Sequence, residues 1–395
     1  MPFTGVSAMD LKKEFVRLAL APGANRRELC RRFGVSPPLM YRLLVRYQAE
    51  GEAGLEERSR RPTTSPARTS TEIEAAVLTL RTEHPAWGGR KIAAVLKRRG
   101  LAAPAPSTVT EILRRAGVEL GAFGGGETSF IRFEHPAPND LWQMDFKGHV
   151  PLRSGRLHPL TALDDHSRFC VVLGACGDQR TRTVKACLTE AFRRYGLPWR
   201  MTMDNGSPWG GGGYGDAYTP LGVWLMEQDI RISHSRPFHP QTQGKDERFH
   251  RTLKAEVLAG LPFEDLLHAA RGFERWRNIY NTERPHDALG LLTPIDRYVP
   301  SPRSYREALE PFEYGPDDQL RHVHADGRIS FKAQRYRVPK AFNGKILAVR
   351  STQKDGVYDI VFRTNRITSI DLTKPVGHLQ PVTDVSEHPS RMSPV

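Results

Sequence analysis

The sequence predicts a multidomain protein in which all-helical segments come first, an α/β core follows and a small β-barrel comes last. A chain of 395 residues is long enough for two to four domains of ordinary size. Helix-start signals and helical spacing dominate as far as residue 118, strand-like and helical runs then alternate, and only strand-like runs follow residue 319. The predicted domains therefore span residues 9–51, 70–118, 135–300 and 319–374.

The composition is strongly basic. Lysine and arginine number 58 against 44 aspartates and glutamates, which gives a net charge of +14. This balance favours a polyanionic partner, although charge alone also fits a generally basic soluble protein. The four cysteines form no CxxC pair, so neither a zinc finger nor a disulfide framework is indicated. No apolar run approaches the ~20 residues of a membrane helix and the first residues lack signal-peptide features, so no membrane partner is expected.

The first predicted domain, residues 9–51, has the spacing of a helix-turn-helix. Its helices are expected over residues 10–20, 26–33 and 37–47. Gly34 supplies the sharp turn between the second and third of them. The third helix would present three side chains to a DNA major groove: Tyr41, Arg42 and Arg46. A plain three-helix packing module is the alternative.

Residues 70–118 form a second all-helical segment, which follows a polar linker with two prolines. Helices are expected near residues 71–82, 89–99 and 108–116. The middle helix is crowded with cations, and we expect Arg90 and Lys91 among them to contact DNA. The segment resembles a second helix-turn-helix, with a purely structural bundle as the alternative.

The α/β core is expected to open with an antiparallel meander, because strand-like runs follow one another at residues 141–152, 157–162 and 168–175. Later core elements are a helix over 183–195, a short strand ending at Asp204, a helix near 221–228 and a strand over 230–235. Asp164 and Asp165 lie between the second and third strands. We expect them to be structural and to pair with Arg168, with a metal contact as the alternative.

Two carboxylates in this core stand in settings that suggest chemistry. Asp145 lies in an aromatic-rich strand-like run, where a carboxylate is costly unless a cation or metal compensates it. Asp204 ends a short strand, the position at which an α/β sheet presents functional groups, although the Asn-Gly that follows by itself indicates only a turn. Hard oxygen ligands of this kind suit Mg²⁺ or Mn²⁺. Nearby histidines are expected to hydrogen-bond a phosphate or a carboxylate rather than build a metal site: His234, His239 and His250.

A third carboxylate, Glu247, is expected on a helix that begins near Gly244. Glu247, Arg251 and Lys254 stand at positions i, i+4 and i+7, which puts one carboxylate and two cations on a single face. Such a face can hold a metal and a phosphate together. An exposed helix with an ordinary Glu–Arg pair is the alternative, and Lys254 would then simply be solvated.

The last segment, residues 319–374, alternates apolar and polar residues in short runs and is expected to form the small β-barrel. Its twelve basic and four acidic residues leave an excess of eight positive charges. That charge, interleaved with tyrosines, suits a DNA backbone.

Several motifs support one resemblance: Trp142-Gln143-Met144-Asp145, Asp164-Asp165-His166-Ser167-Arg168, Asp204-Asn205-Gly206, residues 240–247 and Tyr280-Asn281-Thr282-Glu283-Arg284-Pro285-His286. In this order they resemble the DDE integrase-like insertion-sequence transposases, whose core is related to that of retroviral integrases. The resemblance covers most of the chain and implies a ribonuclease H-like core. It also implies a DNA transposase that binds the terminal inverted repeats of a mobile element, nicks its ends and joins the 3′-hydroxyl ends to target DNA.

The resemblance implies a site and partners as well. Asp145, Asp204 and Glu247 would be the catalytic residues of a polynucleotidyl transferase and would hold two Mg²⁺ ions, with Mn²⁺ able to substitute. A basic residue on the helix of Glu247 would contact DNA phosphate, and Lys254 and Arg251 compete for this role. The expected partners are double-stranded DNA and further copies of the chain on that DNA. The resemblance is also consistent with a cytoplasmic, nucleoid-associated protein.

The chain departs from the resemblance in two places. Retroviral integrases carry a zinc-binding His/Cys module ahead of the core, and this chain does not. Forty-two residues separate Asp204 from Glu247, more than the resemblance predicts, and the glycine-rich stretch 209–215 is expected to account for the excess as a flexible loop. Two rival functions stay open: a DNA-binding regulator that retained the fold, which the intact carboxylates argue against, and a simple nuclease, which only an assay of joining excludes.

Overall fold

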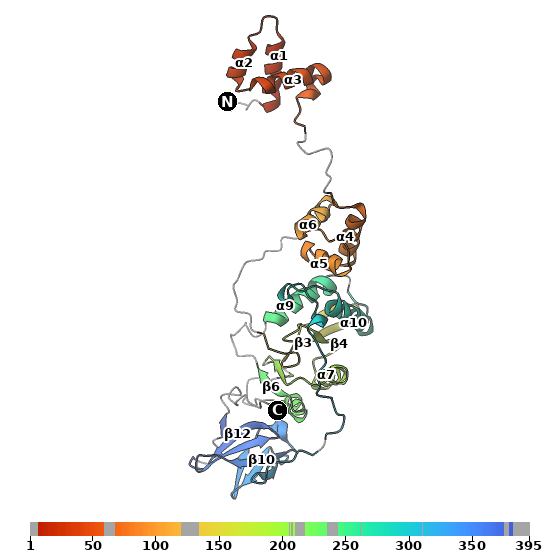
Figure 1. Cartoon of the computed structure of the whole chain (residues 1–395). Coiled ribbons are helices and arrows are strands. Elements are labelled where there is room, and N and C mark those ends of the chain that lie inside the picture. Colours follow the sequence, from red (N-terminus) through yellow and green to blue (C-terminus); the bar gives the residue numbers. More distant parts are fainter. Residues whose placement is uncertain are drawn as a thin grey trace. The chain divides into compact units, whose positions relative to one another are not determined.

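The computed structural model describes residues 7–58, 68–119, 134–204, 206, 208–209, 218–234, 244–260, 262–309, 311–374 and 379–381. The chain divides into two compact units, Met1–Arg68 and Thr69–Val395 (Figure 1). Most of the predicted glycine-rich loop, residues 210–215, lies outside the described residues. The same is true of residues 240–243 ahead of Glu247 and of His239.

The first unit confirms the three predicted helices, α1 (Ala8–Leu20), α2 (Arg26–Phe33) and α3 (Pro37–Glu50). Gly34 ends α2 with a φ of 64°, a left-handed conformation that costs glycine little. A 3-10 turn, η1 (Gly51–Leu55), then folds back onto α3, and Leu55 joins the buried cluster around Phe15. The fold-back requires a glycine, because a Cβ at Gly54 would lie 2.3 Å from the Arg46 carbonyl oxygen.

The second unit begins with the second predicted group of helices, α4 (Thr71–Glu83), α5 (Gly89–Arg98) and α6 (Pro106–Arg115). Their shared core contains the buried side chains of Trp87, Ile92 and Leu113. At the end of α5, both terminal nitrogens of Arg98 lie 3.0 Å from the Asp296 carboxylate oxygens, in the 3-10 turn η5 (Pro294–Asp296). A bidentate ion pair therefore attaches these helices to the α/β core.

The α/β core is built on a mixed sheet in the order β2-β3-β1-β5-β6, with β4 paired to β3. Its strands are β1 (Trp142–Phe146), β2 (Val150–Leu152), β3 (Gly155–Asp164), β4 (Cys170–Cys176), β5 (Arg200–Met203) and β6 (Arg231–His234). β3 pairs antiparallel with β1, β2 and β4, whereas β5 runs parallel to β1 and to β6. The predicted meander is confirmed, except that the run over residues 141–152 is two strands. Gly148, at a φ of 94°, lies in the break between them.

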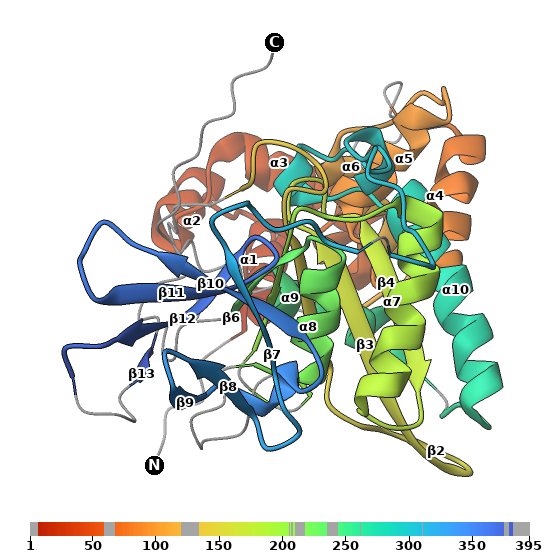
Figure 2. The same ribbon diagram turned by 90° about the horizontal axis from the view of Figure 1, so that it is seen from below.

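Helices pack on both faces of this sheet (Figure 2). On one face, α7 (Thr181–Tyr195) and α8 (Pro220–Glu227) share an apolar cluster with Met144 and Leu160. On the other, α9 (Gly244–Leu253), its π-helical continuation η3 (Lys254–Leu258) and α10 (Leu266–Thr282) surround Leu163. Successive strand residues point to opposite faces, so Asp145 and Thr161 belong to the face that α9 covers. A 3-10 turn, η4 (Asp287–Leu289), follows α10.

The predicted C-terminal β-barrel is wrong for the described residues. The strands β7 (Gln319–His322), β10 (Ile346–Ser351), β11 (Val357–Phe362), β12 (Asn365–Asp371) and β13 (Leu379–Pro381) form an open sheet in the order β13-β12-β11-β10-β7. β8 (Arg328–Phe331) and β9 (Gln334–Arg337) pair only with each other, ahead of the 3-10 turn η6 (Lys340–Phe342). Alternation along a strand decides which face is buried, but closure depends on pairing between the edge strands. Here the edges β7 and β13 stay apart in the sheet order.

Candidate active site

Two of the three predicted carboxylates meet where neighbouring parallel strands end. Asp145 lies near the end of β1 and Asp204 directly follows β5, and the two strands pair in parallel from Trp142 and Met201 onward. The pKa of Asp145 is raised to about 6, chiefly by burial and further by the neighbouring Asp204 carboxylate. Two carboxylates this close repel each other, and a bound cation would relieve the repulsion. The chemistry of this pair fits a divalent metal.

The third carboxylate, Glu247, lies on the exposed face of α9. The helix buries a different set of side chains against the sheet: Asp246, Phe249, His250 and Leu253. Glu247, Arg251 and Lys254 are all exposed and share one face of the helix, and that shared face is what their spacing predicted. In the described part of the chain, no three His, Cys, Asp or Glu side chains lie close enough to hold one metal ion. The structure thus brings Asp145 and Asp204 together and places Glu247 on the helix that packs beside β1.

His250 links α9 to the Asp145 strand. Its Nε2 is 2.9 Å from Thr161 Oγ1, and that hydroxyl donates to the Asp145 carbonyl oxygen over 3.0 Å. Its Nδ1 is 3.9 Å from the Asp145 carboxylate. Burial lowers the pKa of His250 to about 4, so the ring is neutral near pH 7. The predicted hydrogen bond from this histidine to a carboxylate is therefore absent among the described residues, because 3.9 Å is too long for one. Its hydrogen bond is to Thr161, which lies 89 residues away and which no sequence signal indicates.

His234 supports the second carboxylate through the backbone. Its Nδ1 is 3.0 Å from the Asp204 carbonyl oxygen. Because β6 runs parallel to β5, this ring lies beside the end of the strand that carries Asp204. His234 and His250 thus each contact a strand that ends in a candidate metal ligand, and neither belongs to a cluster that could hold a metal among the residues described.

The two aspartates at the end of β3 do not form side-chain ion pairs with Arg168 as expected. Asp164 is fully buried and accepts hydrogen bonds from the Asn139 and Ser167 backbone amides over 2.6 and 2.8 Å. Arg168 instead reaches Glu134, with 3.2 Å between the charged atoms. Its backbone adopts a left-handed φ of 63°, which sets it apart from its neighbours at this turn. Asp165 instead contacts Gln143 in β1 and Lys245 in α9.

The motif at residues 280–286 braces the core. Asn281 accepts from the Cys170 amide over 2.8 Å and donates to the Cys170 carbonyl over 3.1 Å, which ties α10 to β4. Arg284 donates to Glu256 over 2.8 Å, and Trp276 donates to the other oxygen of Glu256 over 2.9 Å. Glu256 lies in the π-helical turn that begins with Lys254. These contacts hold in place the π-helical turn that ends the helix of Glu247.

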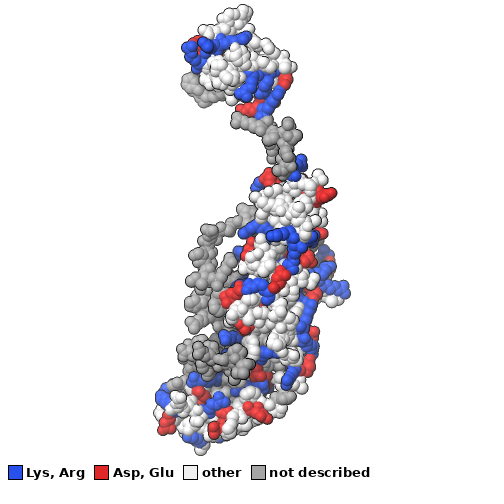
Figure 3. All heavy atoms as spheres, in the orientation of Figure 1, with Lys and Arg blue, Asp and Glu red and all other residues white. Residues whose placement is uncertain are grey.

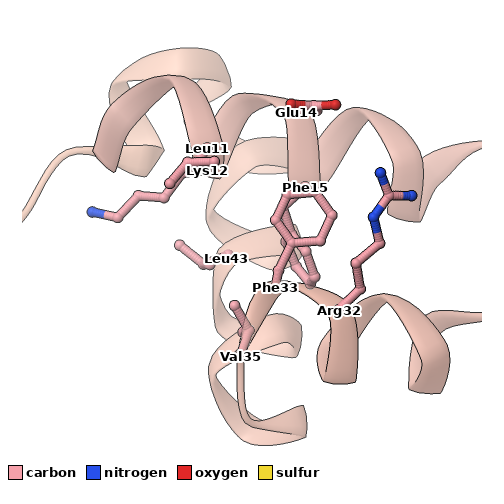
Figure 4. A pocket seen from close by; sticks show the side chains of 8 residues that line it. All are labelled: Leu11, Lys12, Glu14, Phe15, Arg32, Phe33, Val35 and Leu43. Carbon is pink, nitrogen blue, oxygen red and sulfur yellow. The ribbon is translucent and has the colours of Figure 1, made fainter. Parts of the chain in front are cut away.

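The first unit presents only part of the predicted DNA-reading face. Tyr41 and Arg42 are exposed on α3, and Val45 beside them is 64% exposed. Arg46 is half-buried, and its guanidinium donates to the Glu56 carbonyl oxygen over 2.6 Å. Arg46 is half-buried because η1 folds back across the end of α3 and brings Glu56 next to it. A hollow in this unit, lined by Phe15 among others, includes none of the predicted DNA-reading residues (Figure 4).

The predicted DNA contacts on α5 point at the α/β core. Arg90 lies 3.3 Å from the Asp287 carboxylate. The pKa of Lys91 is lowered to about 8, first by burial and then by the positive charge of Arg284. Other Lys and Arg side chains spread over the surfaces of both units (Figure 3). Lys91 is therefore largely withdrawn from solvent, whereas the Arg90 side chain is 71% exposed and its contact with DNA stays a prediction.

Family models match most segments of the chain. Models described as an integrase core domain match residues 135–240 and 228–294, and the C-terminal domain of IS481 family transposases matches residues 318–376. A helix-turn-helix domain matches residues 11–63 and a homeodomain-like domain matches residues 40–113. The chain belongs to the DDE integrase-like insertion-sequence transposases. Together, the matches account for both helical segments, the sheet that carries Asp145 and Asp204, and the C-terminal sheets.

Individual proteins are similar to parts of the chain. The transposase is 25% identical over 228 residues to the 31.7 kDa protein of insertion element IS407 from Burkholderia multivorans, covering 57% of this chain and 79% of that protein. It is 26% identical over 167 residues to the transposase of insertion sequence element IS904 from Lactococcus lactis, covering 42% and 63% of the two chains. A chain of the simian T-cell lymphotropic virus intasome solved with a PP2A regulatory subunit is 14% identical, with a TM-score of 0.38 over 78% of this chain and 99% of its own.

Proposed function

We propose that this transposase binds the terminal inverted repeats of its element, nicks the element's ends and joins the resulting 3′-hydroxyl ends to target DNA. The observation that carries the proposal is the meeting of Asp145 and Asp204 at the ends of parallel strands, with Glu247 on the helix packed beside β1. The family models and the transposase relatives support the broader transposase function.

The donor set fits hard divalent cations. Asp145, Asp204 and Glu247 would hold two Mg²⁺ ions, with Mn²⁺ able to substitute, because carboxylate oxygens are the ligands these ions prefer. The raised pKa of Asp145 supports this assignment, since a cation would stabilise the charged form that burial disfavours. When bound, the metals supply Lewis-acid stabilisation of the reacting phosphate and lower the pKa of a bound water.

The chain's own side chains would position the DNA. Lys254 lies two helical turns beyond Glu247, about 10 Å along the axis, so it can contact the phosphate next to the scissile one. Arg251 lies between them and is the competitor for this contact. Water would attack first to nick the end, and the freed 3′-hydroxyl would then attack a target phosphodiester in line. This sequence needs no covalent enzyme intermediate.

The helical segments would supply DNA recognition. Tyr41 and Arg42 are the exposed members of the predicted reading face and would enter a major groove. The Arg46 guanidinium is held in part by the Glu56 carbonyl, whereas the Arg90 side chain is 71% exposed beside Asp287 and would be open to a phosphate. Pairing of two element ends with one target would require more than one copy of the chain, so we propose a homo-oligomer on DNA that acts at the nucleoid.

A simple nuclease is the second candidate, because the same carboxylates can cut DNA without joining it. The transposase and nuclease functions are distinguished by one assay. The protein is incubated with Mg²⁺, a supercoiled plasmid and a labelled element end that already carries its 3′-hydroxyl. Transfer of the label to the plasmid supports the transposase. Cutting of an uncut end together with no transfer would favour the nuclease, and binding with neither reaction would favour a DNA-binding regulator.

A further inference from the structure

Asp165 lies at the junction of the strand that carries Asp145 and the helix that carries Glu247. Its side chain is buried, with 1% of the residue exposed, directly after β3. One carboxylate oxygen, Oδ1, accepts from Gln143 Nε2 over 2.7 Å and from the Lys245 ammonium. The other, Oδ2, accepts from the His135 backbone amide over 2.8 Å. Each of these three hydrogen-bond donors comes from a different segment of the described chain.

Two of these donors stand next to candidate metal ligands. Gln143 precedes Asp145 by two residues in β1, so both side chains lie on the same face of the strand. Lys245 precedes Glu247 by two residues in the first turn of α9. A single buried carboxylate thus bridges the two elements that carry Asp145 and Glu247.

The remaining contacts of α9 with the core do not replace this bridge. Phe249 and Leu253 pack in an apolar cluster, and apolar packing has little directional preference. His250 contacts Thr161 and the Asp145 region one turn further along the helix. A charge-assisted hydrogen bond at Lys245 has both a short range and a preferred direction, so it sets the first turn of α9 against β1.

We propose that Asp165 is a positioning residue, which holds Glu247 in register with Asp145 so that the carboxylates can share metal ions. The inference rests on the proposed function, because it takes Glu247 to be a ligand. The sequence alone suggested only local pairing with Arg168, and 80 residues separate the two partners Asp165 and Lys245.

The neighbouring Asp164 offers a matched control. It is equally buried, but its donors are Asn139 and Ser167, which lie in loops, and none is on α9. Asp165→Asn removes the charge that holds Lys245 and keeps the side-chain shape, while Asp164→Asn makes the same change without touching α9. Lys245→Met removes the same bridge from the helix side, and Lys245→Arg restores a cation.

The experiment measures Mn²⁺ binding by the electron paramagnetic resonance signal of free Mn²⁺, joining as a function of Mg²⁺ concentration, end-DNA binding and thermal unfolding. Asp165→Asn and Lys245→Met should weaken metal binding and raise the half-saturating Mg²⁺ concentration, each by roughly 10- to 100-fold, as expected for the loss of an outer-sphere support. End-DNA binding should stay within about twofold, Lys245→Arg should recover most of the loss, and Asp164→Asn should change only the melting temperature.

Wild-type metal binding by both Asp165→Asn and Lys245→Met would overturn the inference, as would a loss that Asp164→Asn reproduces. If Asp165→Asn does not fold, Lys245→Met and Lys245→Arg alone decide the question. A wild-type protein that binds Mn²⁺ but joins no DNA would count against the proposed function, and the metal-binding comparison would still test the bridge.

Discussion

Arg284 and Glu256 form a buried ion pair, with 2.8 Å between Arg284 Nε and a Glu256 oxygen and 9% of each side chain exposed. Trp276 donates to the remaining Glu256 oxygen, so the carboxylate is paired on both sides. The pair joins the end of α10 to the π-helical turn that contains Lys254. The Arg284 of the 280–286 motif is thus a structural clamp on the helix that presents the proposed phosphate contact.

Arg284→Met should lower the free energy of unfolding by roughly 3 to 5 kcal/mol, because removing one partner leaves the Glu256 charge buried without its cation. Urea unfolding monitored by tryptophan fluorescence measures the change. Arg251→Met is the matched control, since it removes an arginine from an exposed position on the neighbouring helix. Equal stability of the two variants would show that the pair contributes nothing beyond a surface charge.

Lys254→Ala should weaken joining and reduce the salt dependence of end-DNA binding by about one counterion, because one phosphate contact is lost. The measurement is the slope of binding affinity against salt concentration. Arg251→Ala, one turn nearer Glu247, tests the competitor for the same phosphate. A wild-type slope and wild-type joining for Lys254→Ala would mean that this lysine only faces water.

Arg42→Ala should reduce the preference for element ends over random DNA by on the order of 1 to 3 kcal/mol, the value of one good base contact. Arg46→Ala should instead lower the melting temperature of the protein, because it removes the bond to the Glu56 carbonyl that holds η1. Binding to specific and random DNA, measured at one salt concentration, separates the two roles. An equal loss on both DNAs for Arg42→Ala would make this residue a phosphate contact.

Ionisation of Asp145 should destabilise the metal-free protein. Its pKa is raised to about 6, so the folded protein keeps a proton that the unfolded chain loses near pH 4. The contribution of Asp145 to the free energy of unfolding therefore falls as the pH rises from about 4 to about 6. Asp145→Asn cannot ionise and should gain stability relative to the wild type across this window, as measured by urea unfolding in a chelator. Parallel pH profiles would refute the burial argument.

The sequence predicted correctly those features that depend on residues close together in the chain. The bounds of α2 follow from a helix start at Asn25 and a left-handed Gly34, and both signals lie within a few residues of the helix. The exposed Glu247, Arg251 and Lys254 face follows from helical period alone. Sequence spacing also put Arg46 beside Arg42, but it could not show that η1 folds back and takes up the Arg46 guanidinium.

The features that the sequence did not predict depend on contacts between residues far apart in the chain. The Asp165–Lys245 contact joins residues 80 apart, and nothing near either residue indicates the other. The C-terminal strands alternate as a barrel would, yet β8 and β9 pair only with each other in the described residues and leave the larger sheet open. Arg90 and Lys91 look like phosphate contacts in sequence, and only the docking of α5 near Asp287 shows what they face.

The central claim is that Asp145, Asp204 and Glu247 act together in cutting and joining DNA. The most direct test compares strand transfer in Mg²⁺ by Asp145→Asn, Asp204→Asn and Glu247→Gln with that of Glu264→Gln, which changes a carboxylate paired to Arg153 on the surface. Each of the first three should abolish cleavage and joining and leave end-DNA binding nearly intact, because only a ligand's charge is lost, and Glu264→Gln should join like the wild type. Near-normal joining by any one of the three would contradict its assignment as a metal ligand.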